Sequence, residues 1–255
     1  GVPQVIARSE FAGLLNQEKS IRSTGGVTEI SLGFAANMDD RLYIGGSLGV
    51  PILNYSRVSS YYEEDATGVT GNQFNYLRYD ETYTSKGAGI NARLGVIFKA
   101  AQLLRFGLSV QSPALYGLKD DYSSTLTTDI EDKGTNGQPY LYTVKSSDVY
   151  ASDGSNPQYR YDLQTPWKFL VSGSFVLHQV SDITQQKGFI TADVEYVSAK
   201  SSKFSPADNT DAQYYNDLNS TIKAYYKGSF NFRVGGELKF KTIMGRLGFA
   251  YYGNP

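Results

Sequence analysis

One short segment has the spacing of a hydrolase nucleophile. Residues 45–49 read Gly-Gly-Ser-Leu-Gly, which matches the G-x-S-x-G pattern of serine hydrolases. That chemistry needs a strand, a sharp turn and a helix around the serine, with a histidine as the base. Here the segment lies inside an alternating run, and His178 is the only histidine of the chain. Both points favour a packing role for the glycines, so we expect no catalytic residue and no enzyme.

Metal and cofactor sites have few possible ligands in this chain. Cysteine is absent, and a single histidine excludes a histidine-rich metal site. Residues 129–134 read Asp-Ile-Glu-Asp-Lys-Gly, which is acidic but lacks the ligand spacing of an EF-hand, so we interpret it as a solvated loop. The formal net charge of -1 offers no basic footprint for nucleic acid. We therefore predict no metal, no cofactor and no nucleic-acid partner.

The composition indicates β structure. The chain has 21 Tyr, 13 Phe and 26 Gly but only 1 Trp and 2 Met, and Tyr favours strands while Gly serves turns and sheet corners. No run of about 18 apolar residues is present to form a transmembrane helix. If this chain crosses a membrane, it must therefore do so as a β-barrel.

Alternation of apolar and polar residues with a period of two predicts eight strands. They cover residues 27–37, 41–52, 84–98, 103–111, 160–178, 187–199, 226–240 and 243–252.

The connections between these strands alternate in length. Short turns are expected around residues 38–40, 99–102, 180–186 and 241–242, and long polar loops at 59–83, 112–159 and 200–225. Outer-membrane barrels combine short turns on one rim with long loops on the other. The sequence thus predicts an all-β fold, an antiparallel up-and-down transmembrane β-barrel, with residues 1–255 forming part of one barrel domain. A soluble β-sandwich is the alternative.

Charged residues fall opposite the apolar rows of these strands. In a sandwich they would form the wetted outer faces, whereas in a barrel they would line a watery lumen and pair across it. The lumen-lining candidates are Arg93, Lys168, Asp193, Glu195, Arg233, Glu237 and Arg246.

The long loops are rich in tyrosine, which has an apolar ring and a polar hydroxyl and suits a surface that binds apolar ligands. Residues 207–227 also have the spacing of a short helix. The candidates for capturing an apolar ligand are Tyr61, Tyr62, Tyr76, Tyr79, Tyr214, Tyr215 and Leu218.

Three segments carry a family resemblance. Residues 231–238 (Asn-Phe-Arg-Val-Gly-Gly-Glu-Leu) look like an N-x-R-x-G-x-E-Y strand, and residues 245–255 look like the R-x-G-Y-x-Y-x-x-x-P strand that follows it. Residues 89–99 with 104–109, and the exit Ser-Pro-Ala-Leu-Tyr at 112–116, resemble a central hairpin of the same family. The chain thus resembles the FadL/TodX family of outer-membrane transporters, above all its large members labelled hemin receptors.

The resemblance implies passive uptake of a hydrophobic compound, such as a long-chain fatty acid or an aromatic hydrocarbon, across the outer membrane of a Gram-negative bacterium. Membrane lipid and a hydrophobic small molecule would be the partners. The family's fourteen strands and its N-terminal Asn-Pro-Ala plug exceed what is found here, so we expect an internal portion of a longer protein. Two alternatives stay open: a barrel that serves as a protein-secretion or surface-attachment partner of an envelope protein, and a soluble β-sandwich binding module.

Overall fold

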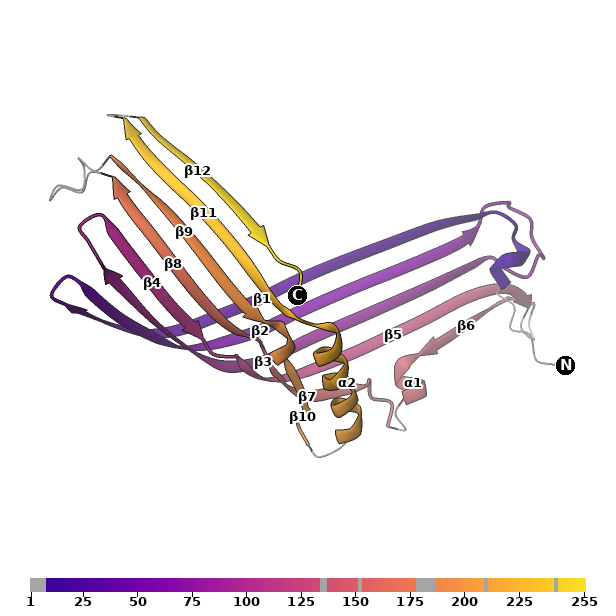
Figure 1. The fold of residues 1–255 in the computed structure, drawn as a ribbon. Coiled ribbons are helices and arrows are strands. Elements are labelled where there is room, and N and C mark those ends of the chain that lie inside the picture. The colour runs from indigo at the N-terminus through magenta and orange to yellow at the C-terminus, as the bar shows by residue number, and fades with distance from the viewer. Residues whose placement is uncertain (1–7, 134–136, 151–152, 178–186, 209–210, 241–242) are drawn as a thin grey trace. The chain divides into compact units, whose positions relative to one another are not determined.

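Most of the described chain is built from β-strands (Figure 1). The computed structural model describes residues 8–133, 137–150, 153–177, 187–208, 211–240 and 243–255. Its elements are η1 (Arg8–Phe11), β1 (Leu15–Met38), β2 (Leu42–Asp65), β3 (Tyr76–Lys99), β4 (Leu104–Gln111), β5 (Leu115–Lys133), β6 (Pro139–Lys145), α1 (Ser146–Tyr150), β7 (Gln158–Gln164), β8 (Trp167–Leu177), β9 (Gly188–Ser198), η3 (Ala199–Ser201), β10 (Lys203–Pro206), α2 (Ala212–Tyr225), β11 (Gly228–Phe240) and β12 (Ile243–Tyr252).

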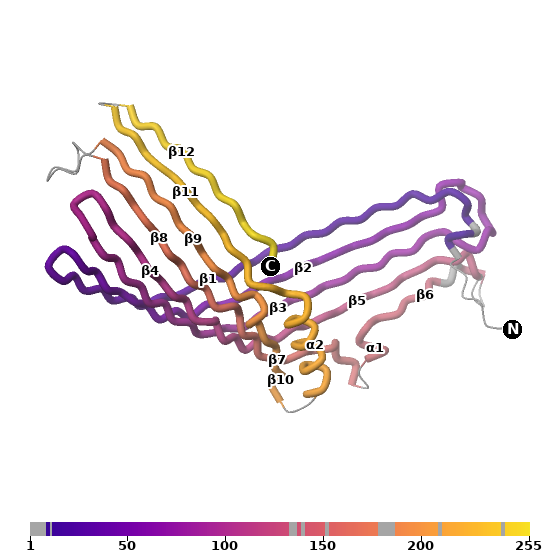
Figure 2. The backbone as a smooth tube through the Cα atoms, in the orientation of Figure 1, coloured from indigo at the N-terminus to yellow at the C-terminus, as the bar shows by residue number. Residues whose placement is uncertain are grey.

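All twelve strands belong to one sheet in which the chain runs up and down. β1 pairs with β2 and β2 with β3, then β3 pairs with both β4 and β5. The order continues through β4, β8, β9, β11 and β12, and Figure 2 shows the last four side by side. The predicted fold class, an all-β chain of antiparallel up-and-down strands, is confirmed. The β-sandwich alternative is wrong, because the strands form a single sheet.

Seven of the eight predicted strands each overlap one observed strand, and the strand predicted at 160–178 overlaps two, β7 and β8. The turn predicted at 38–40 is also present: Arg41 N–H donates to the Met38 carbonyl at 3.1 Å, with Asp39 and Asp40 both at positive φ. Two central residues at positive φ suit the right-handed twist of a hairpin. The turns predicted at 180–186 and 241–242 lie outside the described residues.

Proline interrupts two of the predicted strands or their continuations. β4 ends just before Ser112-Pro113, and the strand predicted at 160–178 is split into β7 and β8 at Thr165-Pro166. Proline has no N–H to give to a ladder, so regular pairing stops there. The residue before each proline keeps two hydrogen bonds to the facing segment, because its backbone N–H donates, from Ser112 to the Ala92 carbonyl at 2.9 Å and from Thr165 to the Ala114 carbonyl at 3.0 Å, and its hydroxyl accepts. The Ser112 hydroxyl accepts the Ala92 N–H at 2.9 Å, and the Thr165 hydroxyl accepts the Ala114 N–H at 2.8 Å.

The chain forms two compact units. Unit 1 comprises Gly1–Val27, Leu53–Lys86 and Lys119–Tyr159, and unit 2 comprises Thr28–Ile52, Gly87–Leu118 and Arg160–Pro255. That residues 1–255 form part of one barrel domain stays a prediction. The boundaries coincide with a change in composition, because β1 is polar up to Gly26 and alternates between apolar and polar residues after it.

Unit 1 corrects the prediction of long loops. Segments 59–83 and 112–159 are largely regular, since β2 continues to Asp65, β3 begins at Tyr76, and β5, β6 and α1 fill much of the rest. The first half of β1 was not predicted as a strand either. These strands are polar on both faces, so they lack the alternation used to find strands. Cross-strand side-chain bonds support them, such as Gln17 to Glu63 at 2.6 Å and Asn16 to Glu64 at 3.2 Å.

The third predicted loop, 200–225, contains η3, β10 and α2 in unit 2, and the helix expected at 207–227 is α2. Within the described residues, no helix is long and apolar enough to cross a membrane, a finding that does not bear on crossing by strands.

Candidate functional site

The strand registers of unit 2 sort its side chains onto two faces. One row across five strands reads Leu108, Val171, Val194, Phe232 and Tyr251. Because side chains alternate along a strand, the flanking rows lie on the opposite face. We call the face of this row the apolar face and the other the polar face.

The apolar face carries no charge on any described residue of β4, β8, β9, β11 and β12. Most of its large side chains are exposed, and Leu247 reaches 86%. The members of this face are Leu104, Phe106, Leu108 and Val110 on β4; Trp167, Phe169, Val171, Gly173, Phe175 and Leu177 on β8; Gly188, Ile190, Ala192, Val194, Tyr196 and Ser198 on β9; Gly228, Phe230, Phe232, Val234, Gly236, Leu238 and Phe240 on β11; and Ile243, Gly245, Leu247, Phe249 and Tyr251 on β12.

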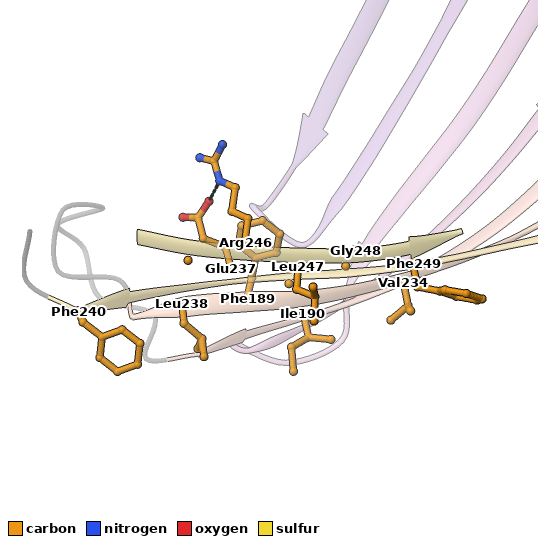
Figure 3. Close-up of a pocket in the computed structure, with 13 residues that line it drawn as sticks. Phe189, Ile190, Val234, Glu237, Leu238, Phe240, Arg246, Leu247, Gly248 and Phe249 are labelled. Atoms are coloured by element: carbon orange, nitrogen blue, oxygen red, sulfur yellow. Dashed lines mark hydrogen bonds and ion pairs between the residues drawn. The ribbon is translucent and has the colours of Figure 1, made fainter. Parts of the chain in front are cut away.

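All seven lumen-lining candidates lie on the polar face. Figure 3 shows the separation at one end of the sheet, with Glu237 and Arg246 on one side and Leu238 and Phe240 on the other. The sequence therefore predicted correctly which side chains share a face, while their exposure to a lumen stays a prediction.

Arg233 bridges two carboxylates of the neighbouring strand. Its guanidinium lies 4.0 Å from Asp193 and 3.7 Å from Glu195. Asn231 donates to the second oxygen of Glu195 at 2.8 Å. The register explains the contacts, because Arg233 stands directly opposite Asp193 and Asn231 opposite Glu195.

The next pair follows the same rule. Arg246 of β12 stands opposite Glu237 of β11, and its Nε donates to the Glu237 carboxylate at 2.6 Å. Lys168 stands opposite Gln111, and no ion pair joins it to a described carboxylate.

Arg93 has a partner that sequence reasoning missed. Its guanidinium contacts the Glu29 carboxylate at 2.8 and 2.9 Å, and Asn91 donates to the same group at 3.1 Å. Glu29 belongs to β1 and Arg93 to β3, so the pair spans the intervening β2. Gly49 of β2 leaves the room: a Cβ there would lie 2.7 Å from the Asn91 side-chain oxygen and 2.9 Å from Glu29. The sequence carried one signal for this partner. Glu29 alternates with the apolar residues Ile30 and Leu32, which puts its side chain on the other face of the strand.

The tyrosine candidates do not form one group. Tyr61, Tyr62, Tyr76 and Tyr79 belong to unit 1, where they are half-buried, and Tyr214, Tyr215 and Leu218 lie on α2 of unit 2. In unit 1 the hydroxyls are engaged: Tyr61 donates to Glu63, and Tyr62 donates to Glu64 at 3.0 Å. Tyr79 shares a 2.9 Å hydrogen bond with Tyr122, a residue outside the predicted set.

Only part of α2 presents an apolar surface. The Asn219 side chain binds both backbone groups of Phe204 in β10, at 2.8 and 2.7 Å, which fixes the helix against the strand edge. Leu218 and Tyr215 are half-buried, whereas Tyr214 is 64% exposed. Tyr225, 79% exposed at the end of the helix, was not among the predicted candidates.

The segment with nucleophile spacing lies within β2. Strand geometry continues from Leu42 through residues 45–49 to Asp65, so no sharp turn or helix surrounds Ser47. His178 lies outside the described residues. The acidic segment 129–134 is mostly the end of β5 rather than a loop, with Glu131 at positive φ and its N–H bound by Asp129 at 2.8 Å.

Comparison with known proteins gives one structural likeness. No family model and no curated protein matches the chain. Among solved structures, the chain is similar to the crystal structure of the Pseudomonas putida toluene transporter TodX, with 10% identity and a TM-score of 0.38, over 93% of this chain and 72% of the other. A likeness of this size does not establish a family, so membership stays a prediction.

The Glu29–Arg93 contact should be measurable as a coupling energy. We expect Glu29→Gln and Arg93→Gln, singly and together, to show non-additivity of about 0.5–3 kcal/mol in the free energy of unfolding. The physical reason is that each single change leaves the other charge without its two-point contact. The control cycle combines Glu29→Gln with Arg105→Gln, since no ion pair joins Arg105 to a described carboxylate. Additive effects in both cycles would show that the Glu29–Arg93 pair contributes nothing.

Alkaline pH should loosen unit 1 through its half-buried tyrosines. Burial, together with hydrogen bonds to Tyr79 and Glu81, raises the pKa of Tyr122, and burial with a hydrogen bond to Asp120 raises the pKa of Tyr83. A tyrosine with a raised folded-state pKa stabilises the fold fully below the unfolded value of about 10, and this contribution is lost as pH rises through the folded value.

The measurement is an alkaline titration that follows tyrosinate absorbance. We expect Tyr122→Phe to remove a step at the high-pH end of the curve, because this hydroxyl is half-buried and must give up its hydrogen bonds to Tyr79 and Glu81 to ionise. Tyr214→Phe, at an exposed helix position, is the control. An unchanged high-pH end in Tyr122→Phe would contradict the prediction.

Proposed function

We propose that the strands of unit 2 cross a lipid bilayer as part of a β-barrel, with the apolar face toward acyl chains and the polar face toward the interior. One observation carries this proposal: five adjacent strands expose a continuous uncharged face, while the opposite face holds the ion pairs of Arg233 and Arg246. Soluble monomers rarely expose an apolar patch of this extent. The strand lengths also fit, since β8 and β9 have 11 residues each and a transmembrane strand needs about 9–11.

The polar halves of the longest strands fit outside the hydrocarbon. β1, β2 and β3 have 24 residues each, about twice the length that a membrane crossing needs. Their unit 1 portions are polar on both faces, so burying them in lipid would leave charges such as Glu63 and Glu64 without water. We therefore assign unit 1 to the aqueous side.

We propose passive uptake of hydrophobic compounds, such as long-chain fatty acids, as the function of this barrel, in the outer membrane of a Gram-negative bacterium. The family resemblance of residues 231–238 and 245–255 supports the ligand class, and the two-faced sheet supports the membrane location. The paired charges of the polar face would line the lumen. A ligand would pass through this lumen without an energy source and without a covalent step.

The second candidate is a barrel that binds a secreted or surface-attached protein. The tyrosine hydroxyls of unit 1 favour it, because Tyr62, Tyr83 and Tyr122 donate to the carboxylates of Glu64, Asp120 and Glu81. Such a surface is ordered and polar. It suits hydrogen bonding to a protein better than adsorption of a hydrocarbon.

Two neighbouring residues test the membrane location. Ala192 lies on the apolar face, in the row of Gly173, Val234 and Phe249, and Thr191 lies on the polar face between Ser174 and Gly235. We expect Ala192→Arg to lower the stability of the vesicle-inserted protein by about 2–4 kcal/mol, because a charge at mid-depth must leave water. Thr191→Arg is the matched control and should be tolerated. The measurement is urea unfolding in lipid vesicles, and equal sensitivity of the two variants would contradict a lipid-facing apolar face.

Uptake by cells tests the ligand class. Changing Tyr214 and Tyr225 to Ser should reduce uptake of a labelled long-chain fatty acid about tenfold, if they supply about 60 Å² of apolar contact at about 25 cal/mol per Å². Gln213→Ser on the same helix is the control. Uptake that survives the double change places capture elsewhere, with Tyr61, Tyr62, Tyr76 and Tyr79 as the next group to change. No uptake by the unaltered, inserted protein would favour the protein-binding candidate.

A further inference from the structure

Aromatic rings form a continuous line near one end of the apolar face. The line runs from β8 through β9 and β11 to β12, with successive ring centroids 5.0–6.4 Å apart. We call it the aromatic belt. Its members are Trp167, Phe169, Tyr196, Phe230, Phe232 and Tyr251.

The belt ends where the regular pairing of these strands ends. Trp167 stands opposite Ser198, and Ser198 stands opposite Gly228, which are the terminal residues of β8, β9 and β11. We call this the boundary row. On the side of the boundary row where the strands pair, the described residues of the apolar face carry no charge. The chemistry of the surface therefore changes sharply at the boundary row.

Lysines follow directly beyond the boundary row. Lys200 lies in η3, two residues past Ser198; Lys203 begins β10; and Lys227 precedes Gly228. Lys223, in the last turn of α2, adds a fourth. All four are exposed, and none is joined by an ion pair to a described carboxylate. We call them the lysine collar.

This order of chemistry matches the profile of a bilayer surface. Trp and Tyr prefer the interface, because the ring is apolar and the N–H or O–H reaches water. Cationic side chains beyond that level meet the phosphates of anionic lipids. A soluble protein partner would have no reason to need an uncharged surface, an aromatic line and a cationic rim in this sequence.

We propose that the boundary row marks the surface of the bilayer, with the aromatic belt at the interface and the lysine collar bound to the phosphates of anionic lipid headgroups. This inference rests on the proposed membrane crossing. It adds the depth of the sheet and the lipid class that it contacts.

The depth can be read directly, because Trp167 is the only tryptophan of the chain. Phe175 lies eight residues further along the same strand, β8, and is not a member of the aromatic belt. At about 3.3 Å per residue and a tilt near 45°, it lies about 19 Å deeper than Trp167, in the inner part of a hydrocarbon core about 30 Å thick. Trp167→Phe with Phe175→Trp therefore moves the single fluorophore from the interface to the inner part of the bilayer.

The first experiment inserts the full chain into phosphatidylcholine vesicles and compares quenching by lipids brominated near the headgroup with quenching by lipids brominated near the chain ends. Trp167 should be quenched more by the shallow bromines, and the Phe175→Trp reporter more by the deep ones. Stronger deep quenching of Trp167 would overturn the proposal. So would a Trp167 that escapes both lipids while the deep reporter is quenched, as expected if a protein or a second copy covers the belt. Failure of both reporters would instead reject the membrane crossing itself.

The second experiment tests the collar with vesicles of increasing phosphatidylglycerol content. The insertion rate of the unaltered chain should rise several-fold with anionic lipid, and Lys200→Gln, Lys203→Gln and Lys227→Gln together should remove most of that rise. The charge-matched control changes the exposed lysines 19, 86 and 145 of unit 1 to Gln and should keep it. Equal lipid dependence of the two triple variants would overturn the role of the collar. The neutral-vesicle rate of the collar variant shows whether it still folds.

Discussion

Strand register is the constraint on which the other features of unit 2 depend. Backbone pairing fixes Arg233 opposite Asp193, Glu237 opposite Arg246, and Val234 opposite both Ala192 and Phe249. A slip of one residue in any strand would move its whole apolar set to the charged face. The ion pairs and the uncharged face therefore support the same alignment, one by attraction across neighbouring strands and the other by excluding charge.

Three arginines of the polar face, Arg93, Arg233 and Arg246, form ion pairs within the sheet. Arg246 meets Glu237 on the adjacent strand, whereas the Glu29–Arg93 pair reaches over a strand at Gly49. Both arrangements keep side chains close to the sheet. The two ion pairs differ in what they require of the residues around them. The Glu29–Arg93 contact crosses a strand, and it is possible only where the intervening residue has no side chain.

Sequence reasoning succeeded where side-chain chemistry alternated. The strands of unit 2 were found because Leu247 and Phe249 are separated by Gly248, as Phe230 and Phe232 are by Asn231. It failed in unit 1, where β2 beyond Ile52 and β3 before Gly87 are polar on both faces and resemble loops. The Glu29–Arg93 pair could not be foreseen, because a single sequence does not reveal which strands lie two apart. The break at Thr165-Pro166 was visible in the sequence, but the apolar residues on either side concealed it.

The unequal sequence separation of paired strands has a consequence for the order of folding. β1 and β2 are joined by a tight turn, and β3 and β4 by a short one, so their pairings close small loops; pairing Gln111 with Lys168 must close a much longer one. Short loops close at lower entropic cost and at higher rates. The hairpins β1–β2, β3–β4 and β11–β12 are thus the natural first products of folding. Each would present free strand edges and an apolar surface until its neighbours pair with it, and such edges and surfaces promote aggregation of partly folded chains.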